Sequence, residues 1–134
     1  MAGLTEIEGI GDVLAAQFTA AGVNGTAALL RKGGTKAGRN ALVAATGIDE
    51  SRVLRFVNHA DLMRIKGVGG EYSELLEAAG VDSVPELAQR NADNLHSRLV
   101  SANAEKKLVR NVPGLKSVRN WVAQAGTMDR VIRH

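Results

Sequence analysis

The sequence predicts an all-α fold made of two tandem repeats of short helices. Three glycine landmarks recur at a single interval of 58 residues, which pairs Gly9 with Gly67, Gly11 with Gly69 and Gly22 with Gly80. Apolar residues between these landmarks follow helical spacing, and the alternation of β-branched residues that is typical of strands is absent. Because two copies of one supersecondary unit must satisfy the same packing, a fixed interval of this kind is strong evidence for architecture.

The first repeat covers residues 1–64. Its first helix is expected to begin at Gly11 and to close at Gly22, since glycine suits the left-handed conformation that ends many helices. One face of this helix carries apolar residues four apart: Ile10, Leu14 and Phe18. A second, short helix is expected over about residues 26–31.

Two further helices complete the first repeat. Thr35 is a good N-cap for the third helix, which should stop at Gly47. Asp49 can cap the fourth helix, whose apolar side carries Val53, Phe56 and Val57. A separate short helical turn is expected over residues 61–64, leading into the second copy.

The second repeat covers residues 65–134 and follows the first closely at its start. The apolar stripe of its first helix consists of Val68, Tyr72, Leu75, Leu76 and Ala79. Gly80 should close that helix. Ser83 and Glu86 have the spacing of a capping box, with Pro85 in the first turn, where proline is tolerated. A third helix is expected through Leu95, Leu99, Val100 and Ala102.

The interval between the repeats changes near the end of the chain. Val53, Phe56 and Val57 match Val118, Trp121 and Val122 at 65 residues instead of 58. An insertion of seven residues therefore lies near residues 103–116. The stretch 98–119 around it sets six basic side chains against a single acidic one, Glu105: Arg98, Lys106, Lys107, Arg110, Lys116 and Arg119. Because the net charge is only +3, the rest of the chain is slightly acidic.

Composition excludes several classes of protein. The chain has no cysteine, which excludes disulfides, thiol catalysis and thiolate zinc sites. No apolar run approaches the roughly 20 residues that span a bilayer, and no signal peptide is visible, so we expect a cytoplasmic protein without membrane contact. The only aromatic residues are one Trp, one Tyr and two Phe, which disfavours base stacking as a mode of binding.

Catalytic and cofactor motifs are missing. The segment 33–39 has the residues of a phosphate loop in the wrong order and without a preceding strand, so Lys36 and Arg39 should face solvent. The histidines show no metal-ligand spacing, and no carboxylate pair or activated nucleophile stands out. We therefore expect a protein that is not an enzyme, with no catalytic residues, no metal, no cofactor and no small-molecule substrate.

Each repeat contains a glycine hairpin, the unit Ile-x-Gly-apolar-Gly, at residues 7–11 and again at residues 65–69. The two glycines permit a tight turn and close approach of another backbone. A helix follows at once, so its free N–H groups and the positive end of its dipole can receive a phosphate.

These residues resemble the helix-hairpin-helix superfamily, and nearly the whole chain resembles a bacterial domain-of-unknown-function family with two such repeats. The best-matching run is residues 61–69, followed by residues 75–81 and 86–88, and residues 106–110 and 121–122 also fit. The resemblance implies two tandem helix-hairpin-helix (SAM-like) repeats of short helices packed together. It also implies sequence-independent binding of the DNA backbone, which is frequent in that superfamily.

The candidate nucleic-acid-binding residues join the second hairpin to the basic insertion: Arg64, Lys66, Gly67, Val68, Gly69, Lys106, Lys107, Arg110 and Lys116. Acidic residues surround the first hairpin and would repel phosphate, so a structural role is expected there: Glu6, Glu8 and Asp12. The second hairpin has cations beside it, although acidic residues follow along the helix.

The alternative function is a protein–protein interaction or self-assembly module that does not bind nucleic acid. Small residues permit close approach of helices, among them Ala15, Ala16, Ala44 and Ala45. The acidic first hairpin would suit a basic partner. The expected partners are therefore the DNA backbone or, in the alternative, another protein or a second copy of the chain.

Overall fold

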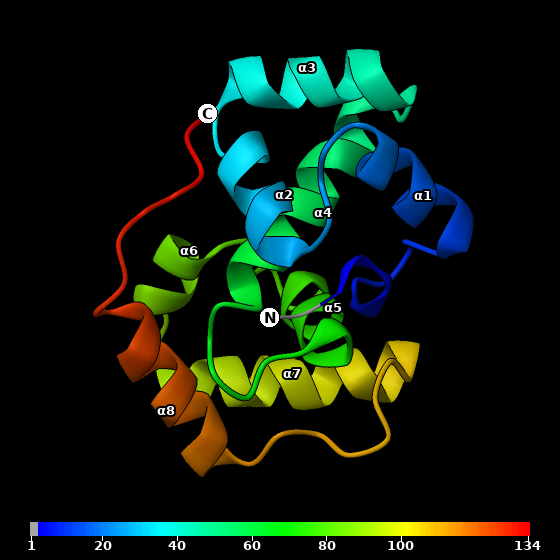
Figure 1. Cartoon of the computed structure of the whole chain (residues 1–134). Helices are drawn as coiled ribbons and strands as arrows, with labels where there is room; N and C mark the ends of the chain where they lie inside the picture. Colours follow the sequence, from blue (N-terminus) through cyan, green and yellow to red (C-terminus); the bar gives the residue numbers. More distant parts are fainter. Residues whose placement is uncertain (1–2) are drawn as a thin grey trace. The chain divides into compact units, whose positions relative to one another are not determined.

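The computed structural model describes residues 3–134, and in this part of the chain it contains helices, turns and irregular segments but no strand (Figure 1). The prediction of an all-α fold is confirmed. None of the helices in the described residues is both long and apolar enough to span a membrane.

The chain forms two compact units. Unit 1 runs from the start of the described residues to Asp61 and also takes in Val131–His134, whereas unit 2 comprises Leu62–Arg130. The boundary thus lies three residues before the end of the expected first repeat. The last four residues of the chain belong to unit 1, although the repeat pattern assigned them to the second copy.

The helices of unit 1 are the 3₁₀ helix η1 (Leu4–Glu6), α1 (Asp12–Ala20), α2 (Thr26–Gly33), α3 (Lys36–Thr46) and α4 (Glu50–Leu62), which ends at the unit boundary. The caps behave as expected. Thr35 Oγ1 accepts a hydrogen bond of 3.0 Å from the Gly38 amide, and Gly47 closes α3 in the left-handed conformation with φ 75°. The ring of Phe18 packs edge-on against Phe56 with centroids 6.2 Å apart, which ties α1 to α4.

Two expectations for unit 1 are wrong. Residues 61–62 do not start a separate turn, because no helix breaker follows Glu50 and α4 continues to Leu62. Arg39 does not face solvent: it is only 4% exposed, and its Nη1 donates to Gly33 O at 2.9 Å. A buried guanidinium needs such acceptors in place of water.

Asp49 gives a pH-dependent prediction. A side-chain hydrogen bond from Arg52 holds the pKa of Asp49 below its usual value of 3.8, and the Arg52 amide donates to the same carboxylate at 3.1 Å. The stabilisation from this cap is therefore present above pH 3.8 and is lost as the pH falls through the lowered pKa. An NMR titration should place the midpoint of Asp49 below 3.8, and Arg52→Ala should return it toward 3.8. Lys36→Ala is the control and should leave the titration midpoint of Asp49 unchanged. Equal Asp49 midpoints in the unaltered chain and in the Arg52→Ala variant would contradict the role of Arg52.

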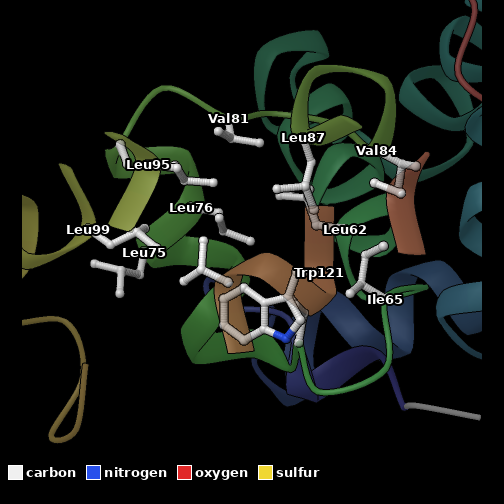
Figure 2. Close-up of a cluster of buried hydrophobic side chains, with 14 of the residues drawn as sticks. Leu62, Ile65, Leu75, Leu76, Val81, Val84, Leu87, Leu95, Leu99 and Trp121 are labelled. Carbon is white, nitrogen blue, oxygen red and sulfur yellow. The ribbon is translucent and has the colours of Figure 1, made fainter. Parts of the chain in front are cut away.

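Unit 2 contains α5 (Gly70–Ala78), α6 (Val84–Ala88), α7 (Ala92–Lys106) and α8 (Leu115–Ala125). α8 packs against both α6 and α7, and α5 packs against α7. Their apolar sides share one core, in which the Trp121 ring lies among aliphatic side chains from all four helices and the preceding turn (Figure 2).

Two local details of unit 2 differ from expectation. The Ser83 hydroxyl makes no capping bond to the backbone of α6 and instead contacts Glu86 Oε1 at 3.4 Å, while Glu86 Oε2 accepts from the Asp82 amide at 3.5 Å. The extra residues of the second repeat are divided between two places. α7 ends at Lys106, two residues beyond the position that corresponds to the end of α3, and the connection to the next helix is five residues longer, residues 107–114 against 47–49.

The sequence repeat is also present in the backbone. Gly9 and Gly67 have φ values of 95° and 99°, and Gly22 and Gly80 have 87° and 91°. These conformations favour glycine at each position. A cation also covers the carbonyl of the closing glycine in each unit: Lys32 Nζ donates to Gly22 O at 3.3 Å and Arg90 Nη2 to Gly80 O at 2.9 Å.

Candidate functional site

The second hairpin, Ile65–Gly69, is a turn that leads directly into α5, and the side chains of Ile65 and Val68 are buried in the core of unit 2. The Val68 amide donates to Ile65 O at 3.0 Å and closes the turn, and Gly67 takes the left-handed conformation. Lys66, Gly67 and Gly69 are all exposed. Gly69 occupies the N-cap position of α5, and no side-chain hydrogen bond caps the helix there. The first N–H groups of α5 therefore have no intrahelical acceptor and can serve an external anion.

α8 holds this hairpin in place through Gln124. The Lys66 amide donates to Gln124 Oε1 at 2.9 Å, and Gln124 Nε2 donates back to Lys66 O at 3.0 Å. The same Nε2 reaches Asn120 Oδ1 at 2.7 Å. The main chain of Lys66 is thus used within the protein, whereas its side chain stays exposed.

The indole ring of Trp121 packs against the backbone of the second hairpin. A side chain at residue 67 would place its Cβ only 3.0 Å from Trp121 Nε1, so the ring packs directly against the Gly67 backbone. Trp121 is 3% exposed, and the Tyr72 ring lies at a centroid distance of 5.4 Å from it. In unit 1 Phe56 has the same relation to Gly9, with a corresponding distance of 3.1 Å. The expectation that both aromatic residues are core anchors is therefore confirmed by their burial.

Two cations of the basic insertion lie on segments that contact the second hairpin or its helix. Lys116 precedes Asn120 and Gln124 at intervals of four along α8, so it lies toward the side of α8 that holds Lys66. Arg110 is next to Asn111, whose carbonyl accepts a 3.1 Å bond from the Tyr72 hydroxyl in the first turn of α5. Both cations are exposed. We name Lys66, Arg110 and Lys116 the hairpin cations.

Three other candidates have different surroundings. Arg64 is half-buried, and its Nη2 donates to Asp129 O at 3.0 Å, so it holds the segment that follows α8. Lys106 and Lys107 are exposed at the C-terminal end of α7. Figure 1 shows that end of α7 and the start of α8 at opposite ends of the connecting segment. Among the described residues, no side-chain hydrogen bond or ion pair joins Lys106 or Lys107 to the second hairpin.

The first hairpin, Ile7–Gly11, shares the geometry but not the charge. The Ile10 amide donates to Ile7 O at 3.1 Å, and Gly11 is the N-cap of α1 without a side-chain hydrogen bond. Glu6, Glu8 and Asp12 are exposed around it. These carboxylates complement the positive end of the α1 dipole and repel phosphate, so an anion would bind more favourably at the second hairpin.

Pattern reasoning missed the residues that fix the second hairpin. Gln124 and Asn120 carry no motif, and the residue 65 positions before Gln124 is His59, which has different chemistry. The Tyr72 hydroxyl was expected only as part of an apolar stripe, yet it binds the basic connection. Among the described residues there is no group of three His, Cys, Asp or Glu side chains that could hold a metal ion.

A protein-family model matches most of the chain. The model of a family described as a domain of unknown function, DUF4332, matches residues 8–128, a range that includes most of both hairpin units and the basic connection. No curated protein and no solved structure matches the chain.

Proposed function

The chain belongs to the DUF4332 family, a domain of unknown function, and from the geometry of unit 2 we propose that it binds the sugar–phosphate backbone of DNA without catalysis and without reading base sequence. The proposal includes a helix-hairpin-helix mode of binding and a cytoplasmic location. The observation that carries it is the turn with Lys66, Gly67 and Gly69 exposed in front of a helix without a side-chain cap, together with exposed cations on the segments bonded to the turn or to α5.

The chemistry of the hairpin suits a phosphate better than a base. Backbone amides at a helix N-terminus donate to any phosphate oxygen, and glycines let the phosphate approach closely. Lysine and arginine neutralise phosphate charge in the same way along any sequence, so these contacts position a protein without specifying bases. The aromatic side chains of unit 2, Tyr72 and Trp121, pack against each other, and Trp121 is buried, which leaves no open platform there for base stacking.

A titration of labelled duplex and single-stranded DNA, followed by fluorescence anisotropy at low salt, tests the proposal. Charge reversal at a hairpin cation, Lys66→Glu or Lys116→Glu, should weaken binding about fivefold, which is roughly 1 kcal/mol. The loss should be the same for unrelated DNA sequences, and the slope of log K against log salt should decrease in magnitude by about 1 for each phosphate contact removed.

Lys36→Glu provides the matched control, because Lys36 is an exposed lysine in the first turn of a helix in unit 1. The DNA affinity of this variant should stay within about twofold of that of the unaltered chain. The change in net charge accounts for the small difference. Absence of saturable binding to both forms of DNA at tens of micromolar protein would remove the proposal. Light scattering on the same samples distinguishes DNA binding from self-assembly. An oligomer that does not bind DNA would support a self-assembly module.

A further inference from the structure

The last residues of the chain, Val131–His134, lie on unit 1 as an extended segment. The Arg133 amide donates to Gly34 O at 2.6 Å, and the Arg133 carbonyl accepts from Arg39 Nη2 at 3.0 Å. Both backbone groups of Arg133 are therefore bonded, while the residue itself is exposed. The contacts recognise the main chain of the segment at this position and leave its side chain free.

Arg39 is built into the protein as a fixed donor. It is 4% exposed, and its Nη1 is held by Gly33 O at 2.9 Å, which leaves Nη2 to reach the segment. By the repeat, helix α7 of unit 2 corresponds to α3, and the buried residues of α7 are two leucines, Leu95 and Leu99. A buried arginine is therefore no requirement of the repeated scaffold, and in unit 1 its second hydrogen bond serves the extended segment.

An apolar anchor and a close backbone approach complete the arrangement. Ile132 belongs to unit 1 and is 2% exposed, so its side chain is buried. A side chain at residue 34 would place its Cβ 3.0 Å from Val131 O, so glycine at this position lets the segment lie against the end of α2. We name Gly33, Gly34 and Arg39 the Arg39 seat.

We propose that the Arg39 seat is a peptide-binding site for an extended segment with a β-branched aliphatic residue in the place of Ile132. The chain fills the site with its own last residues, and the same segment of a second copy fills it when the first is withdrawn. Two of the contacts go to main-chain atoms that any extended peptide offers, and the apolar anchor supplies selectivity, as in other modes of strand recognition. Because the segment is covalently attached, its effective concentration at the site is high, and it therefore excludes a free peptide.

The test uses a fluorescein-labelled peptide with the sequence of residues 129–134 and fluorescence anisotropy. The receiving protein is the full chain with Ile132→Asp, which withdraws its own anchor because a carboxylate is costly to bury. This variant should bind the peptide saturably, and the unaltered chain should bind it at least about tenfold more weakly because its seat is occupied. A peptide carrying the same Ile132→Asp change is the matched control and should bind neither protein.

Arg39→Lys in the Ile132→Asp background keeps the positive charge but removes the two-pronged donor, and it should weaken peptide binding about tenfold. Lack of saturable binding to an Ile132→Asp chain that keeps its helical circular dichroism would overturn the proposal. If that variant unfolds, hydrogen exchange of the unaltered chain decides. Excess unlabelled peptide should then accelerate exchange of the Arg133 amide, and an unchanged rate would also overturn the proposal. DNA binding plays no part in these measurements.

Discussion

Replacing Gly38 by alanine is expected to destabilise unit 1 by about 3 kcal/mol, because the new methyl group has no room. Its Cβ would lie 1.9 Å from Lys32 O and 3.1 Å from the Lys32 carbonyl carbon. These atoms belong to the backbone of the last turn of α2, so no flexible side chain can move aside. The corner between α2 and α3 must open instead. Thermal unfolding followed by circular dichroism should show a Tm lowered by roughly 10 °C.

Gly126→Ala is the matched control for this prediction. Gly126 also has a right-handed helical conformation, with φ −64°, but the nearest atom to an added Cβ is Ala123 O at an ordinary 3.5 Å. This variant should be as stable as the unaltered chain or more stable by about 0.5 kcal/mol, since alanine allows the unfolded chain fewer backbone conformations than glycine does. If the Gly38→Ala and Gly126→Ala variants both had the Tm of the unaltered chain, the close approach of α3 to the carbonyl of Lys32 would be wrong.

The parts of the fold that sequence reasoning predicted correctly are governed by neighbouring residues. Glycines at the closing positions adopt φ values near 90° in both units, as at Gly22 and Gly80, because only glycine takes that conformation without strain. The Thr35 and Asp49 caps depend on hydrogen bonds to amides three residues away. Such chemistry can be read along the chain, so most helix boundaries were predicted to within a few residues.

The features that could not be predicted depend on residues far apart in the sequence. Arg39 looked like a surface residue, but one of its two acceptors is the carbonyl of a residue 94 positions away. The Gln124 amide likewise binds a backbone 58 positions away. Spacing rules describe only the local helix, and the repeat offered no help because its other copy has different residues at these places.

The candidate site shows the same division. The glycines of the second hairpin and the adjacent Lys66 follow from a local motif, and the structure has them exposed on one turn. Grouping Lys66 with Lys106 and Lys107 depended on a count of charges along the sequence. The order of charges in a chain does not fix which of them share a surface. The hydrogen bonds join the hairpin to α8, and they join α5 to residue 111. The hairpin cations are therefore the first variants to test.

Trp121→Ala is expected to cost unit 2 about 3–5 kcal/mol, the usual range for removing a fully buried large aromatic side chain. The indole lies within the apolar core of unit 2 (Figure 2). It packs against the Tyr72 ring and against the Gly67 backbone. Its removal leaves a cavity under the second hairpin. Urea unfolding should give a lower transition midpoint, and the hairpin amides should exchange faster with solvent even where the variant stays folded.

Trp121→Phe is the informative comparison, because the first repeat already uses phenylalanine at this place. A Cβ added at Gly9 would lie 3.1 Å from the Phe56 ring, almost the 3.0 Å between a Cβ added at Gly67 and Trp121 Nε1. Phenylalanine should therefore keep the hairpin in position at a cost of about 1–1.5 kcal/mol and should preserve DNA affinity, whereas the alanine variant should lower it through a loosened turn. An alanine variant that lost less than about 1 kcal/mol would contradict the supporting role of the ring. A folded alanine variant with unchanged DNA affinity would show that the second hairpin does not carry the binding.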